Sequence, residues 1–117
     1  MDGDWPRPVV HFEIRSRDPD GLAPFYEAMF SWTAAEGPVR FFPAGLGGPE
    51  PGPAGHFRHA EHDGVTLFVQ VRSLRESLEL AEKLGGTVTL APLDVPGGPT
   101  IAGITDPHGN PITLVQQ

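Results

Sequence analysis

The sequence predicts an α+β fold made of two related βαβββ modules, and three observations indicate it. Segments of alternating apolar and polar residues are typical of strands. Two of these segments run directly into helices that begin with capping residues. The segment FEIRS at 12–16 also has a counterpart, VQVRS, at 69–73. A repeated strand followed by a capped helix indicates an internal duplication, with module one at about 8–62 and module two at about 65–117.

Composition limits the classes of function. The 117 residues fit one domain, 1–117, and the formal net charge of -7 argues against a nucleic-acid binder. Cysteine is absent, which excludes thiolate metal sites and fits a reducing cytoplasm. No apolar run approaches the ~18 residues of a membrane span. We therefore expect a cytoplasmic protein that contacts neither nucleic acid nor membrane.

The first predicted strand, 9–16, has two different faces, because side chains alternate along a strand. The apolar face carries Val10, Phe12 and Ile14, and the polar face carries His11, Glu13 and Arg15. Asp18-Pro19 then predicts a helix start. Apolar residues at helical spacing predict the buried stripe of this helix. They are Leu22, Phe25, Met29 and Trp32, widened by Tyr26 and Phe30.

The rest of module one is less regular. We expect a strand at 37–43, a Gly- and Pro-rich loop or damaged middle strand at 43–55, and a strand at 56–60. Module two is complete, with strands predicted at 65–73, 87–92, 100–106 and 111–116. Its helix begins at the Ser73/Glu76 capping box and ends at Gly85-Gly86. The buried stripe of that helix is predicted as Leu74, Leu78, Ala81 and Leu84.

Three stretches carry a family resemblance: VHFEIRSRDPDGLAPFYEAMFSW, FVQVRSLRESLELAEKLGG and the closing ITDPHGNPITLVQ. They resemble the vicinal oxygen chelate (VOC) superfamily, the glyoxalase/bleomycin-resistance/dioxygenase fold. The resemblance implies eight strands in a curled mixed sheet around a concave cleft, with helices outside. It also implies a small-molecule ligand and a homodimer.

Metal-dependent members of this superfamily place one His or Glu ligand on each of four strands. In module one, these positions correspond to His11 on the first strand and His56 on the last strand. In module two, they correspond to Thr66 on the first strand, or Phe68 by the internal repeat, and to Thr113 on the last strand. Threonine is a poor ligand, so we expect no cofactor and a polar pair of His11 with Glu13. The alternative is a site of His11, Glu13 and His56, near Gln70, for Zn, Ni, Mn or Fe.

Two functions follow from the resemblance. The first is metal-free binding of a small organic molecule, in which Glu13 pairs with a cationic group. The expected ligand-binding residues are His11, Glu13, Arg15, Phe68, Gln70, Arg72 and Thr113, with an aromatic wall drawn from Trp32, Phe41, Phe42, Phe57 and Phe68. The alternative is a divalent-metal-dependent lyase, isomerase or epimerase whose general base is Glu13, with a raised pKa. Either function predicts that His11→Ala and Glu13→Ala change binding with a modest loss of stability.

Overall fold

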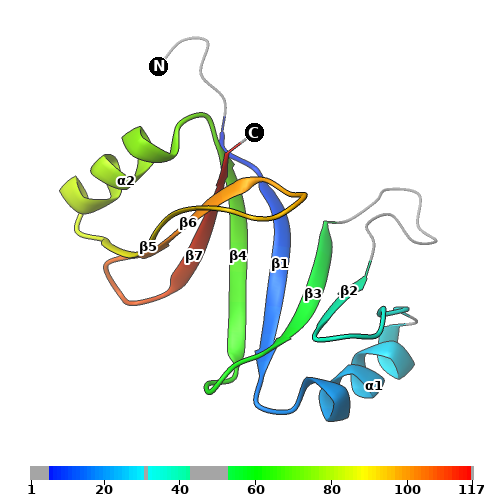
Figure 1. Ribbon diagram of the computed structural model, residues 1–117. Coiled ribbons are helices and arrows are strands. Elements are labelled where there is room, and N and C mark those ends of the chain that lie inside the picture. The colour runs from blue at the N-terminus through cyan, green and yellow to red at the C-terminus, as the bar shows by residue number, and fades with distance from the viewer. Residues whose placement is uncertain (1–5, 31, 43–52, 117) are drawn as a thin grey trace. The chain divides into compact units, whose positions relative to one another are not determined.

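The computed structural model describes residues 6–30, 32–42 and 53–116. This part of the chain contains strands and helices at the predicted places, in an α+β arrangement. In chain order they are β1 (Val9–Ser16), α1 (Pro19–Phe30), β2 (Val39–Phe42), β3 (Ala54–His59), β4 (Gly64–Val71), α2 (Leu74–Lys83), β5 (Thr87–Asp94), β6 (Thr100–Thr105) and β7 (Pro111–Gln116). They form two compact units, the first at His11–Thr66 and the second at residues 6–10 and 67–116. We describe each unit by itself (Figure 1).

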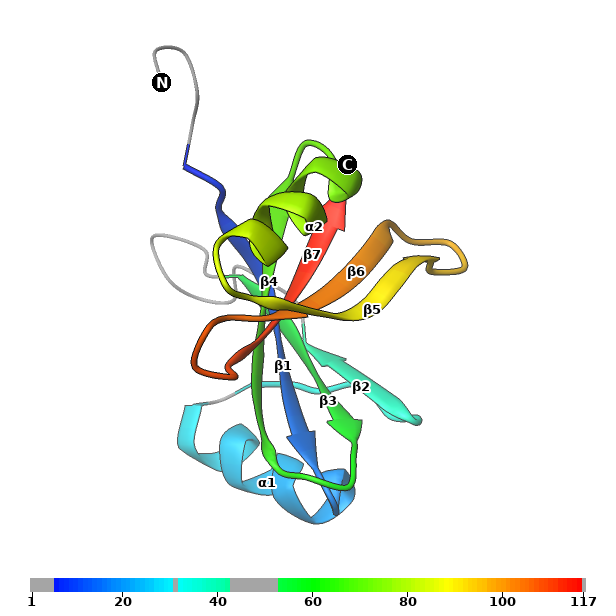
Figure 2. The ribbon, with the colours of Figure 1, turned by 90° about the vertical axis from the view of Figure 1, so that its left-hand side faces the viewer.

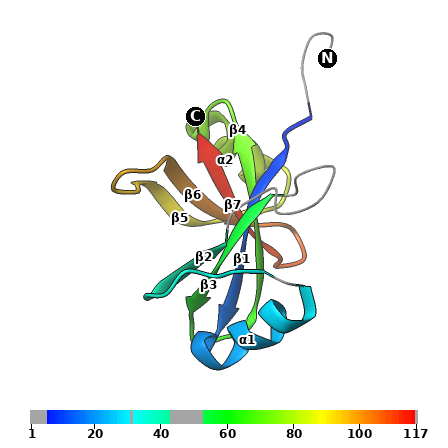
Figure 3. The same ribbon diagram turned by 90° about the vertical axis from the view of Figure 1, so that its right-hand side faces the viewer.

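The two units repeat one pattern of strand pairing. In the first unit, β3 pairs parallel with β1 and antiparallel with β2 (Figure 3). In the second unit, β7 pairs parallel with β4 and antiparallel with β6, and β6 pairs with β5. Strand β2 therefore corresponds to the middle strand β6. Within the described residues, the strand without a counterpart is β5, because residues 32–38 form no strand. The damaged middle strand was predicted in the Gly- and Pro-rich stretch at 43–55. Most of the predicted loop, 43–52, lies outside the described residues.

Helix α1 begins as predicted but buries a different stripe. The carboxylate of Asp18 accepts a hydrogen bond from the backbone N–H of Gly21 (3.1 Å), as a helix cap does. Ala23 is completely buried, yet Phe25 and Met29 are 58% and 59% exposed. Leu22, Tyr26 and Trp32 pack on the core as predicted, but Phe25, Met29 and Phe30 do not. The helix carries two adjacent apolar stripes, and periodicity alone did not show which one faces the sheet.

Aromatic rings fill the core of the first unit. Phe57 is fully buried, with its ring centroid 5.3 Å from that of Phe42 and 5.4 Å from that of Tyr26. Trp32 stacks on Phe42 with centroids 4.5 Å apart. A Cβ at Gly55 would lie 2.5 Å from the Phe42 ring, so glycine is needed there for the ring to reach the sheet. Phe42, Phe57 and Trp32 therefore belong to the core and not to a ligand-binding wall.

The second unit has its own core beneath α2 (Figure 2). The Ser73 hydroxyl accepts a hydrogen bond from the Glu76 N–H (3.2 Å), which confirms the predicted helix start. Leu74 is buried and Leu78 packs beside it. Leu84 was wrongly assigned to this stripe: it is exposed because the helix ends at Lys83 and Leu84 is its C-cap. The remaining members of this core come from the strands; they are Val69, Val71, Ala102, Ile104, Ile112 and Leu114.

A turn over residues 106–110, with the sequence DPHGN, joins β6 to β7. The Asp106 carboxylate accepts hydrogen bonds from the backbone N–H groups of His108 (2.8 Å) and Asn110 (3.0 Å). Gly109 has a positive φ of 85°, which glycine adopts without strain. The turn thereby returns the chain antiparallel onto β6. None of the described helices has the length and apolar character needed to cross a membrane.

Candidate functional site

The first unit carries a polar face opposite its aromatic core. Ile14 and Phe57 are register partners and both lie in the core. Since neighbouring residues on a strand point to opposite faces, Glu13 and its partner His56 lie on the other side of the strands, as predicted for Glu13. Phe41 is the register partner of His56 on β2 and continues the same row. Strand pairing thus brings side chains from β1, β3 and β2 together on one face.

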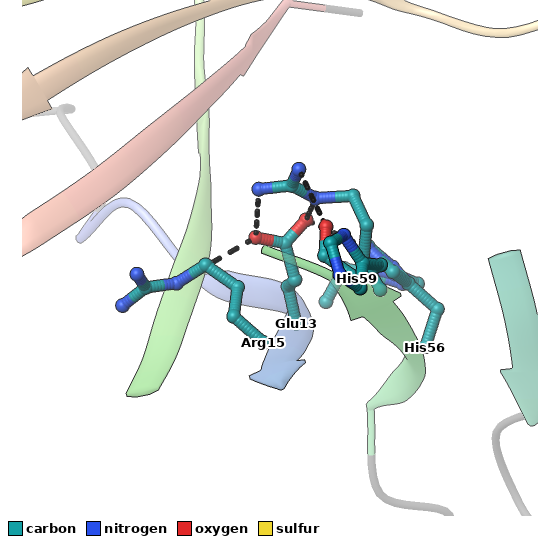
Figure 4. A network of polar contacts seen from close by, with 6 residues as sticks. Glu13, Arg15, His56 and His59 are labelled. Atoms are coloured by element: carbon teal, nitrogen blue, oxygen red, sulfur yellow. Dashed lines mark hydrogen bonds and ion pairs between the residues drawn. The ribbon is translucent and has the colours of Figure 1, made fainter. Parts of the chain in front are cut away.

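Glu13 is the centre of this face and is only 7% exposed. Its Oε2 atom accepts hydrogen bonds from Arg58 Nε (2.7 Å) and His56 Nε2 (2.8 Å). Its Oε1 atom accepts one from Arg58 Nη2 (3.1 Å), so the guanidinium holds the carboxylate through two parallel bonds. Figure 4 shows Arg15 and His56 on opposite sides of Glu13.

These contacts determine the protonation state of Glu13. Burial by itself raises the pKa of a carboxyl group. Here the hydrogen bonds from His56 and Arg58, together with the positive charge of Arg58, outweigh burial and lower the pKa from 4.5 to about 2. The raised pKa expected for a general base was therefore wrong. Glu13 is ionised at neutral pH and holds a proton too weakly to abstract one efficiently.

His11 extends the network beyond His56. Its Nε2 atom lies 2.7 Å from His56 Nδ1, and the two rings stack with centroids 5.0 Å apart. Burial and the neighbouring His56 lower the pKa of His11, while Glu13 acts in the opposite direction. His11 is therefore neutral at pH 7. An ionised Glu13 can only accept, so His56 donates through Nε2; when His56 is neutral, its Nδ1 accepts the N–H of His11. The Phe41 ring lies 6.2 Å from that of His11 and is exposed.

Arg15 lies on the opposite side of Glu13 from His56. Its Nε atom is 3.9 Å from Glu13 Oε1, which is an ion pair without a hydrogen bond. The side chain is 20% exposed, and Nε is buried with no hydrogen-bond partner in the described part of the chain. Its guanidinium lies against the backbone of Gly64, where a Cβ would collide with Arg15 Nη2.

The donors of this face do not fit a metal site as they are arranged. Both ring nitrogens of His56 take part in hydrogen bonds, and both oxygens of Glu13 are bound by Arg58. A divalent cation between them would also lie beside the positive charge of Arg58. Within residues 6–30, 32–42 and 53–116, no three His, Cys, Asp or Glu side chains have the spacing of a metal site. The proposed ligand set of His11, Glu13 and His56 is instead a hydrogen-bonded chain.

The other predicted site residues lie in the second unit. Phe68 is the register partner of Thr113, and Gln70 is the partner of Val115. Val69 and Leu114 pack under α2, so Phe68, Gln70 and Thr113 lie on the opposite face of β4 and β7. Arg72 was placed wrongly on this strand, because β4 ends at Val71 and Arg72 follows it as an exposed residue. A cleft shared by both sets of residues stays a prediction.

Sequence reasoning missed Arg58, which makes the strongest contacts of the network. The signal was present: His56 was identified, and the residue two positions along a strand shares its face. Arg58 is also the register partner of Arg15. His62 and His108 are exposed.

Comparison with protein families decides the relationship. The model of the glyoxalase-like domain matches residues 11–115. The chain belongs to this family, and with it to the VOC superfamily. Comparison with curated proteins finds no match.

Solved structures share the fold of this glyoxalase-like chain. A hypothetical protein from Bacillus halodurans C-125 has a TM-score of 0.69 at 12% identity, over 95% of this chain and 94% of that one. A glyoxalase/bleomycin resistance protein/dioxygenase superfamily member from Vibrio splendidus 12B01 has a TM-score of 0.67 at 13% identity, over 96% and 100%. A methylmalonyl-CoA epimerase variant from Streptomyces coelicolor, in complex with 2-nitronate-propionyl-CoA, has a TM-score of 0.61 at 17% identity, over 94% of each chain. At these identities the likeness shows the fold alone.

Proposed function

We propose that this glyoxalase-like protein binds a small organic molecule on the polar face of its first unit, and that the protein groups there act without a metal ion. The observation that carries the proposal is the buried, ionised Glu13 held by Arg58 and His56 on the face away from α1. The pKa of Glu13, lowered to about 2 by specific partners, supports a functional role for this face, since strongly shifted pKa values cluster at functional sites.

The surroundings of Glu13 also support a binding role. Next to the ionised network lie three rings, those of His11, His56 and Phe41, and Phe41 is 54% exposed. An apolar surface beside a few fixed polar groups is the usual composition of small-molecule sites. The epimerase neighbour shows that this fold can hold an organic ligand.

A thermal-shift panel of small organic molecules tests the proposal. A ligand that binds only the folded protein stabilises it by about 2.7 kcal/mol when its concentration is 100 times Kd, which raises Tm by several degrees. We expect at least one compound to raise Tm equally with and without EDTA, and to do so less in Glu13→Gln. The matched control is Glu79→Gln, which removes the same charge from an exposed position on α2 and should leave the shift unchanged. A broad panel without any shift contradicts the proposal.

A divalent-metal-dependent lyase, isomerase or epimerase is the second candidate, favoured by the epimerase neighbour. It requires Arg58 to release Glu13, since the donors do not fit a metal in their present hydrogen bonds. Metal analysis of protein purified without chelators separates the two candidates. Stoichiometric Zn, Ni, Mn or Fe that is lost in His11→Ala would replace the binding proposal with this one. The homodimer and the cytoplasmic location stay predictions.

A further inference from the structure

The charges on the polar face do not balance. Glu13 contributes one negative charge, while Arg58 and Arg15 each contribute a positive one within 4 Å of its oxygens. Arg58 satisfies Glu13 through two hydrogen bonds and is 46% exposed, so water can solvate its outer side. His11 is neutral. Glu13, Arg58 and Arg15 together therefore carry a net charge of +1, in a protein whose net charge is -7.

The Nε–H group of Arg15 is a buried donor that has no hydrogen-bond acceptor among the described residues. A buried donor without a hydrogen bond is destabilising, and a buried cation more so. The one acid in contact with Arg15 within the described residues is Glu13, at 3.9 Å, beyond hydrogen-bonding distance. Its neighbour Arg17 differs, because it is 73% exposed and pairs with Asp63 at 3.4 Å. A ligand that carries an acceptor to Arg15 would satisfy this donor.

We propose that the ligand of this site is a small monocarboxylate whose carboxylate binds the Arg15 guanidinium. This inference rests on the proposed function and names its ligand class. It reverses the charge expected from the sequence, because the carboxylate of Glu13 is already paired and cannot serve a cationic group.

The local charge also favours a monoanion over a phosphate. One guanidinium, Arg15, is available for the ligand, and a planar carboxylate matches its fork of N–H groups. A dianionic phosphate would leave one charge uncompensated near Glu13, where burial makes the excess unfavourable. Gly64 matters for this geometry, since a side chain there would displace the guanidinium.

An NMR titration of the full chain with three probes of one shape tests the inference. The probes are benzoate, benzamide and benzylammonium, with inorganic phosphate as a fourth. The readout is the Nε–H resonance of Arg15 together with the backbone amides of β1 and β3. We expect benzoate to shift the Arg15 Nε–H signal along a saturable curve. Benzamide and benzylammonium should bind at least about tenfold more weakly, which is the usual effect of losing a charge-assisted hydrogen bond.

Variants separate Arg15 from its surroundings. Arg15→Gln should weaken benzoate binding about tenfold or more and leave benzamide within about twofold. Arg15→Lys keeps the charge without the fork and should fall between. The matched control, Arg17→Gln, removes the same charge two residues away and should leave both probes unchanged. Arg15→Lys also serves if Arg15→Gln fails to fold.

The outcomes distinguish the two proposals. If benzamide or benzylammonium binds on this face as well as benzoate does, the ligand class is wrong and the binding function stands. Tighter binding of phosphate than of benzoate also overturns the monocarboxylate. If none of the four probes binds and the wider panel gives no thermal shift, both proposals fail. Benzoate binding that survives in Arg15→Gln removes Arg15 from the site.

Discussion

Glu13 and Gln70 occupy the same position in the repeated segments FEIRS and VQVRS, yet their surroundings differ. Glu13 lies opposite His56 on β3, whereas Gln70 lies opposite Val115 on β7. Both strand pairs are parallel, and both leave the helix-covered core on the other face. One unit thus holds an ionised network where the other holds an amide beside an apolar side chain.

This comparison indicates that the residues on the two faces of a duplicated strand can change independently of each other. The core face keeps its apolar character in both copies, with Ile14 matching Val71. The opposite face does not pack against the helix. Its residues can therefore be replaced by polar ones that serve binding or catalysis. In the described chain, the ionised network is confined to the first unit.

The largest expected effect on the free energy of unfolding comes from the apolar cores, of which each unit has its own. Phe57→Ala should lower the free energy of unfolding by about 3 to 5 kcal/mol, because it removes a fully buried ring and leaves a cavity. Leu114→Ala in the second unit should cost about 2 to 4 kcal/mol. Urea unfolding measures both. A loss below about 1 kcal/mol for Phe57→Ala would show that the aromatic core is packed differently.

Acid should remove the stability that Glu13 contributes to the first unit. The pKa of Glu13 is lowered from 4.5 to about 2 by folding, so its contribution is present above pH 4.5 and is lost as the pH falls toward 2. At about 1.4 kcal/mol per tenfold change, the full effect is about 3 kcal/mol. Unfolding of the wild type and Glu13→Gln from pH 7 to pH 3 should show their stabilities converging in acid. A constant difference would contradict the lowered pKa.

Truncating Glu13 and Gln70 to alanine should give different losses of stability in the two units at neutral pH. Glu13→Ala should cost about 2 to 3 kcal/mol, because Arg58 and His56 lose a charged, buried partner. Gln70→Ala should cost about 1 kcal/mol or less, as is usual away from a charged network. This revises the modest loss expected for Glu13 from the sequence. Equal losses in the two variants would remove the energetic difference between the units.

The smallest effect is expected on the exposed stripe of α1. Phe25→Gln should change the free energy of unfolding by less than about 0.5 kcal/mol, because the ring is 58% exposed. Leu74 offers the contrast in the second unit, since Leu74→Gln buries a polar group at a position that is 3% exposed. Destabilisation by Phe25→Gln of more than about 1 kcal/mol would place Phe25 in the core after all.

Sequence reasoning was most successful where one local rule decides the structure. Alternation predicted the two faces of β1, and capping residues predicted the starts of both helices at Asp18 and Ser73. It failed where contacts between residues distant in the sequence decide the structure. The choice between the Tyr26 stripe and the Phe25 stripe of α1 depends on how the helix meets the sheet, which periodicity does not contain.

The candidate site shows the same limit. Glu13 and His56 were found from strand parity and from the family pattern, but the pKa of Glu13 was expected to move in the wrong direction. Its sign depends on Arg58, which reaches Glu13 only because β3 pairs parallel with β1 in one register. A single sequence shows which residues share a face, while the pairing of distant strands shows which of them touch.

The pKa of Glu13 tests the account most directly, because the metal-free network and the anionic ligand class both depend on its pairing with Arg58. A 13C NMR titration of its side-chain carboxyl carbon measures it in the folded protein. The account predicts a signal that stays in the ionised position from pH 7 down to about pH 3, with a midpoint near 2. A midpoint at or above 4.5 would contradict the account and return Glu13 to the role of an unpaired acid.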